Sequence, residues 1–89
     1  MATLITTKNC KKCEIVKPLA HKIGVKVLDF EEPEAQAELG FLDLLGRPLS
    51  APILLLSDGS YIEGDILKIN KELETIEELE KAFNDETGL

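Results

Sequence analysis

Two cysteines separated by two lysines, Cys10-Lys11-Lys12-Cys13, are the residues of this chain best suited to chemistry. A bond between them would close a very short loop, and so short a loop restricts an unfolded chain little. Small secreted domains that depend on disulfides usually carry four or more cysteines, whereas this chain has two. The pair is therefore better suited to thiol–disulfide exchange than to holding the fold together.

The pattern around the cysteines places them at the start of a helix. Residues 2–6 are apolar and β-branched, which predicts a strand, and from Cys10 the apolar residues recur every three or four positions up to Gly24. Unpaired N–H groups and the helix dipole stabilise an anion at a helix N-terminus, so they should lower the pKa of a thiol there. Cys10 is then the exposed nucleophile, and Cys13, about one turn further in, resolves the mixed disulfide.

Positive charge gathers around the same pair, although the net charge of the chain is -7. Residues 1–26 hold six lysines and one acidic residue, whereas residues 27–89 hold sixteen acidic and four basic residues. Lys8, Lys11 and Lys12 are expected to lower the pKa of the nucleophile further if their ammonium groups lie near its sulfur. A chance distribution of solvated charges is the alternative. The negative total argues against nucleic acid as a partner.

A metal site is the main competing interpretation of the cysteine pair. Structural zinc and iron–sulfur clusters take four ligands, usually from two such pairs, and this chain adds a single histidine, His21, eight residues after Cys13. We therefore predict no metal site. A cluster shared between two chains and a purely structural cysteine pair stay as alternatives.

The rest of the chain alternates strands and helices. Residues 25–30 predict a strand, and a helix starting at Pro33 should end before Gly46 and Pro48. Residues 53–56 predict a strand buried on both faces, followed by an Asp-Gly turn and a strand over residues 61–63. The buried side of the helix from Pro33 is expected to include Ala35, Ala37, Leu39, Leu42 and Leu45.

A last helix is predicted over residues 75–84, because Thr75 and Glu78 fit a capping box. Pro18 falls within the first helix and should bend it near residues 14–17. The order is β-α-β-α-β-β-α, which predicts an α/β fold of one domain, residues 1–89, with a mixed four-stranded sheet and helices on both faces. The apolar face of the last helix is expected to consist of Ile76, Leu79, Ala82 and Phe83.

Three local features make this pattern resemble the thioredoxin/glutaredoxin family over nearly the whole chain. Pro18 lies five residues after Cys13, where thioredoxins have a helix-kinking proline, and Gly64-Asp65 follows the hairpin as in many glutaredoxins. Ser50-Ala51-Pro52 directly precedes the buried strand, where the family has a cis-proline packed against the cysteines. The resemblance implies that the Ala51–Pro52 bond is cis and that the backbone of Ala51 pairs with the substrate chain.

The resemblance also implies a function. We expect a thiol–disulfide oxidoreductase that reduces protein disulfides through its dithiol, with Lys11, Lys12, Ala51-Pro52 and Gly64-Asp65 contacting the substrate. The chain needs no cofactor beyond its redox-active disulfide. A low-molecular-weight thiol or a reductase would reduce this disulfide back to the dithiol after each reaction. The alternative is a non-catalytic binding module of the same fold for a peptide, glutathione or a shared iron–sulfur cluster.

The small size of the chain favours a glutaredoxin over a thioredoxin, but two features depart from the usual glutaredoxin sequence. Lys-Lys replaces the usual Pro-Tyr or Gly-Pro between the cysteines, and the aromatic residue that often contacts glutathione is missing. That absence argues against glutathione, although Gly64 and Asp65 would lie near its γ-glutamyl group if it bound. We expect a cytoplasmic monomer with no membrane contact, since no signal peptide and no apolar run of roughly 18 residues are present.

Overall fold

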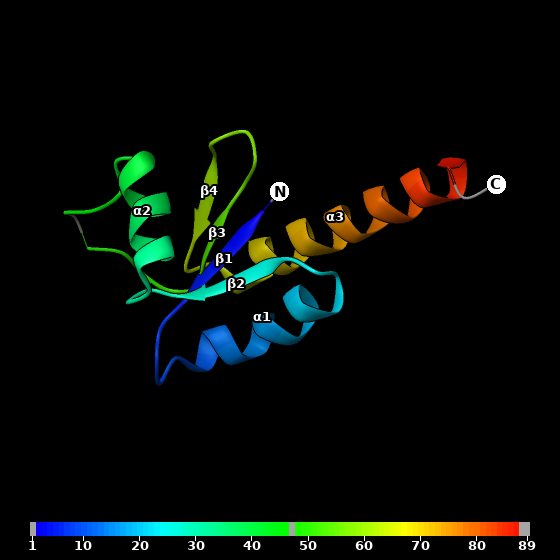
Figure 1. Cartoon of the computed structure of the whole chain (residues 1–89). Helices are drawn as coiled ribbons and strands as arrows, with labels where there is room; N and C mark the ends of the chain where they lie inside the picture. The colour runs from blue at the N-terminus through cyan, green and yellow to red at the C-terminus, as the bar shows by residue number, and fades with distance from the viewer. Residues whose placement is uncertain (1, 47, 88–89) are drawn as a thin grey trace.

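The computed structural model describes residues 2–46 and 48–87, with side chains up to residue 82. Within these residues the elements follow the predicted order β-α-β-α-β-β-α (Figure 1). The elements are β1 (Thr3–Thr6), α1 (Lys11–Lys22), β2 (Lys26–Asp29), α2 (Pro33–Phe41), β3 (Ile53–Leu55), β4 (Tyr61–Glu63) and α3 (Ile66–Thr87).

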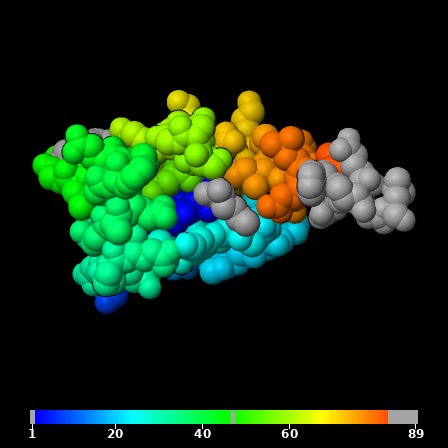
Figure 2. Space-filling view, turned by 45° about the horizontal axis from the view of Figure 1, so that its top comes forward, coloured from blue at the N-terminus to red at the C-terminus, as the bar shows by residue number. Residues whose placement is uncertain are grey.

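The four strands form one sheet in the order β2-β1-β3-β4. β1 runs parallel to β2, with Leu4 opposite Val27, and antiparallel to β3, with Leu4 opposite Leu54. β4 returns antiparallel to β3 through the Asp-Gly turn. Little of β1 is visible in Figure 2, between the cyan surface around β2 and the yellow-green surface of the hairpin. The sheet is therefore mixed, as predicted, with β1 and β3 in its interior.

Helices cover both faces of this sheet because successive side chains of a strand point to opposite faces. Leu4 and Leu54 belong to a core that also takes residues from α1 and α3, among them Val16 and Leu73. Ile5 packs on the other face, in a second core that includes α2. A fully buried side chain of this size stabilises the fold by roughly 1.5–3 kcal/mol, so two cores hold the strand that leads to Cys10.

α1 is closed by Gly24, as predicted. Gly24 has a φ of +78°, and its N–H donates to the carbonyl of His21 at 3.2 Å. The N–H of Val25 donates to the carbonyl of Ala20 at 2.9 Å, which completes a Schellman motif. Pro18 lies within the helix, and the bend near residues 14–17 stays a prediction.

α2 ends earlier than predicted, at Phe41. Asp43 takes the left-handed position with a φ of +59°, and the N–H of Leu44 donates to the carbonyl of Leu39 at 2.9 Å. This Schellman motif turns the chain so that Leu44 is buried and Leu45 is exposed. Of the predicted buried side, Ala35 and Leu39 are fully buried and Leu42 is half-buried, whereas the predictions for Ala37 and Leu45 were wrong.

α3 begins nine residues before the predicted start at Thr75. Asp65 caps it, since its carboxylate accepts a hydrogen bond from the N–H of Lys68 at 3.1 Å. Thr75 lies in mid-helix, where its hydroxyl donates to the carbonyl of Lys71 at 3.0 Å. The capping box was therefore wrong: a threonine can satisfy its hydroxyl inside a helix, so the local signal does not require a helix start.

The buried face of α3 also differs from the prediction. Ile69 and Leu73 are fully buried and Ile76 packs against the same core, whereas Leu79 and Ala82 are exposed. The prediction for the side chain of Phe83 lies outside the described residues.

The molecule is elongated, with extents of 47 × 26 × 19 Å, because α3 continues beyond the sheet (Figure 1). None of the helices described combines the length and the apolar character needed to cross a membrane.

Candidate active site

Cys10 occupies the N-cap of α1, and its sulfur acts as the capping group. The backbone of Cys10 is extended, and its Sγ accepts a hydrogen bond from the N–H of Cys13 at 3.1 Å. Asn9 before it has a φ of +56°, which turns the chain from β1 into the helix. A backbone N–H of the first helical turn thus donates to the sulfur that the sequence predicts to be the nucleophile.

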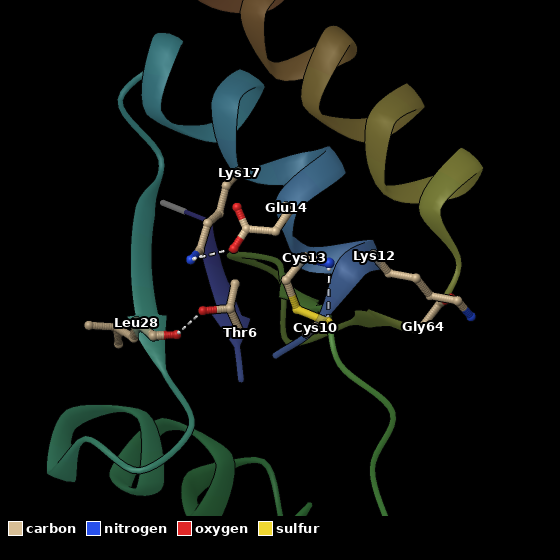
Figure 3. The surroundings of a disulfide bond; sticks show 8 residues. All are labelled: Thr6, Cys10, Lys12, Cys13, Glu14, Lys17, Leu28 and Gly64. Atoms are coloured by element: carbon tan, nitrogen blue, oxygen red, sulfur yellow. Dashed lines mark hydrogen bonds and ion pairs between the residues drawn. A yellow bond between two sulfur atoms is a disulfide. The ribbon is translucent and has the colours of Figure 1, made fainter. Parts of the chain in front are cut away.

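Cys10 and Cys13 form a disulfide across this first turn, with their Cα atoms 5.2 Å apart (Figure 3). Cys13 is fully buried, whereas Cys10 is partly exposed. Of the two cysteines, Cys10 is therefore the one with surface open to solvent, whereas Cys13 has none. The division into an attacking Cys10 and a resolving Cys13 stays a prediction, and this difference in burial is its structural basis.

The lysines around the disulfide take different directions. The ammonium of Lys8 lies 3.8 Å from the carboxylate of Glu31, and the ammonium of Lys12 donates to the carbonyl of Gly64 at 3.5 Å. Lys11 is exposed, and its ammonium makes no hydrogen bond or ion pair with the described residues. No lysine ammonium in the described part of the chain is within hydrogen-bond distance of either sulfur, whereas the N–H of Cys13 donates to the sulfur of Cys10.

The segment Ser50–Pro52 lies at the same end of the central strands β1 and β3 as the cysteines. β1 and β3 pair with Ile5 opposite Ile53, so residues just before β3 lie beside residues just after β1. The Ala51–Pro52 peptide bond is cis, the arrangement that the resemblance implies, and Pro52 is fully buried. Thr7, at the end of β1, and Ala51 line one small cavity of about 120 Å³. Its other lining residues are Phe30, Leu49 and Ile53.

Ala51 presents unused backbone groups at this end of the sheet. It is half-buried, and neither its N–H nor its C=O makes a hydrogen bond with any residue that the structure describes. A substrate segment that binds in an extended conformation forms backbone hydrogen bonds with groups of this kind. The position predicted for substrate pairing is therefore open.

Two hydrogen bonds hold the segment on either side of Ala51. The N–H of Ser50 donates to the carboxylate of Glu63 at 2.9 Å, and the N–H of Gly64 donates to the carbonyl of Pro52 at 2.8 Å. Gly64 has a φ of +71° and packs directly against Ser50. Sequence reasoning identified Gly64 but missed Glu63 and Ser50, because no local pattern indicates a contact between residues thirteen positions apart.

Asp65, which was predicted together with Gly64 to contact the substrate, has a structural role at the start of α3. Its carboxylate caps α3, and its side chain is half-buried. The Gly64-Asp65 pair is nevertheless joined to α1 through the ammonium of Lys12. The structure thus connects the start of α1, the loop before α3 and the cis-proline segment.

Two other features lie away from this region. A larger cavity of about 490 Å³ is lined by α2 and the hairpin turn and includes neither cysteine. His21 is exposed near the C-terminal end of α1, and no group of three or more metal-binding side chains occurs among the residues described.

Comparison with known proteins bears on the fold alone. No protein-family model and no curated protein sequence matches this chain. A crystal structure of thioredoxin O2 from Arabidopsis thaliana in the oxidized state superposes on it with a TM-score of 0.52 and 19% sequence identity. The match covers 83% of this chain and 71% of that thioredoxin. The chain therefore has a thioredoxin-like fold, with the Cys10–Cys13 disulfide at the start of its first helix.

Proposed function

We propose that this protein is a thiol–disulfide oxidoreductase that reduces protein disulfides through Cys10 and Cys13. The observation that carries the proposal is that Cys10, a partly exposed residue at the N-cap of α1, is disulfide-bonded to the fully buried Cys13. A purely structural pair would gain nothing from placing one of its cysteines partly exposed at a helix end. A nucleophile gains both access and stabilisation of its thiolate there.

The reaction transfers two electrons and two protons from the dithiol to the substrate. The thiolate of Cys10 attacks one sulfur of the substrate disulfide, the substrate S–S bond breaks, and the leaving thiolate takes up a proton. The thiolate of Cys13 then attacks Sγ of Cys10, which releases the second substrate thiol and leaves the Cys10–Cys13 disulfide. A low-molecular-weight thiol or a reductase must reduce that disulfide before the next cycle.

The groups around Cys10 support a polypeptide substrate. The unused backbone of Ala51 offers pairing to an extended segment, and the small cavity beside it offers room for an apolar side chain. Exposed Lys11 and Lys12 favour acidic residues next to the substrate disulfide. Glutathione would be the smaller alternative, placed by Gly64 and Asp65.

A trapped intermediate tests this proposal directly. The Cys13→Ser variant, in its reduced state, is expected to accumulate a mixed disulfide between Cys10 and a substrate such as insulin, because the resolving thiol is gone. The Cys10→Ser variant is the matched control and should trap far less, since Cys13 is buried. If Cys13→Ser forms no adduct and the wild-type chain does not reduce insulin, the enzyme proposal is wrong and a binding module is favoured.

The same variant isolates the titration of the nucleophile. In Cys13→Ser the thiol of Cys10 is the one that titrates, and its pKa should lie below the usual value of about 8.5 because the N–H of residue 13 and the helix start stabilise the thiolate. Thiolate absorbance against pH measures this, with the urea-unfolded variant as reference. An equal pKa in the folded and unfolded states would show that the helix start does not stabilise the thiolate.

A further inference from the structure

The bond between Glu63 and the cis-proline segment has no part in the fold's sheet or helices. Glu63 is the last residue of β4, and its carboxylate reaches the N–H of Ser50, the residue just before Ala51. Ser50 is exposed and lies outside any strand or helix, so no regular backbone partner holds its N–H. A carboxylate that accepts a backbone N–H makes a stronger bond than a neutral acceptor does.

The far side of Ala51 is fixed by a different bond, from the N–H of Gly64 to the carbonyl of Pro52. Two consecutive residues, Glu63 and Gly64, therefore hold the two residues that flank Ala51. The ammonium of Lys12 contacts the carbonyl of Gly64, so the same pair is joined to the helix that carries the cysteines. The backbone groups of Ala51 are left unbonded, among the residues described, between two anchored neighbours.

We propose that Glu63 is a positioning residue that fixes the backbone of Ala51 for pairing with the substrate polypeptide. This inference rests on the proposed function. Without the carboxylate, the segment before Ala51 loses its anchor, and substrate binding must then order it. The change should raise KM for a polypeptide disulfide and leave kcat nearly unchanged, because Glu63 does not touch the reacting sulfurs.

Three variants separate the acceptor from the charge. Glu63→Ala removes the acceptor and is expected to raise KM for insulin reduction by about 5- to 10-fold, the size expected for one partly exposed charge-assisted hydrogen bond. Glu63→Gln keeps an oxygen that accepts the N–H of Ser50, so it should restore KM to within about 2-fold of wild type. Glu74→Ala removes an exposed carboxylate of α3 and is the matched control.

A small aromatic disulfide with no peptide backbone provides the second readout. Its KM should be about the same in Glu63→Ala and wild type, since it cannot pair with Ala51. An equal rise of KM for both substrates, a fall in kcat alone, or a Glu63→Gln variant as impaired as Glu63→Ala would overturn the assignment.

Amide hydrogen exchange at Ser50 tests the anchor independently of activity. The N–H of Ser50 should be protected in wild type and Glu63→Gln and should exchange faster in Glu63→Ala. Rapid exchange in all three would refute the anchor even if the enzyme is active. Protection at Ser50 in a chain that reduces no disulfide would instead refute the proposed function and its dependent positioning role.

Discussion

Replacing Gly64 by alanine should destabilise the protein more than the same change at Gly59, although both glycines have a positive φ. Gly59 has a φ of +90°, and nothing lies within 4 Å of the position that a Cβ would take there, so Gly59→Ala isolates the backbone effect. The left-handed conformation costs alanine about 1–2 kcal/mol, and the smaller entropy of its unfolded chain offsets about 0.4–1 kcal/mol. We therefore expect Gly59→Ala to cost about 1 kcal/mol.

Gly64 adds a steric contact to that backbone cost. A Cβ there would lie 3.1 Å from the Cβ of Ser50 and 3.4 Å from its carbonyl oxygen. Ser50 cannot simply move aside, because its N–H is held by Glu63, while the N–H of Gly64 itself holds Pro52. Overpacking of this kind costs about 1–3 kcal/mol, so with the backbone cost of about 1 kcal/mol Gly64→Ala should lose about 2–4 kcal/mol in all.

Urea unfolding of the oxidised protein measures the difference. The chain has one tyrosine and no tryptophan, so helical circular dichroism is the appropriate signal. A difference of about 1 kcal/mol corresponds to about 4–8 °C in Tm for a domain of this size, which is easily resolved. If the two variants lose equal stability with equal m-values, Gly64 does not press on the cis-proline segment, and the contact between Gly64 and Ser50 is wrong.

Two further variants test local features. Asp65→Ala removes the cap of α3 and should lower the free energy of unfolding in urea by about 1 kcal/mol. Thr75→Ala should change it by less than about 0.5 kcal/mol. If Thr75→Ala lost more stability than Asp65→Ala, the helix cap would be at Thr75 and not at Asp65. Hydrogen bonds from the hydroxyl and N–H of Ser60 lower the pKa of Asp58 below its usual 3.8. Their contribution to stability is therefore fully present above pH 3.8 and is lost as the pH falls through the lowered pKa of the folded state. In Ser60→Ala, NMR titration should find the pKa of Asp58 raised toward its ordinary value, and an unchanged pKa would contradict the assignment.

Elements defined by short-range patterns were predictable from the residues. The apolar β-branched run of β1, the helical spacing from Cys10 to Gly24 and the Asp-Gly turn each depend on neighbours within a few positions. They were enough to place Cys10 at a helix N-terminus, which is the basis of its predicted chemistry. The mixed sheet followed from their order, and the structure confirms it.

The start of α3 depended on packing over a longer range. Asp65 begins a helix because Ile69 and Leu73 then reach the core shared with α1. A sequence signal for it exists, since Asp65 is followed by apolar residues at helical spacing, but Thr75 offered a stronger local cap. Burial of two large side chains outweighs a capping preference of about 1 kcal/mol.

The surroundings of the cysteines were set by contacts between distant segments. Nothing in the local sequence indicates that Lys8 pairs with Glu31, or that Lys12 reaches Gly64. Lys8 and Glu31 meet because β1 and β2 run parallel and end side by side, and the β1–β3 register with the hairpin brings the loop of Gly64 to the same end of the sheet. The cysteine motif is therefore a local property of the chain, whereas the substrate-facing side of the site is a product of its tertiary structure.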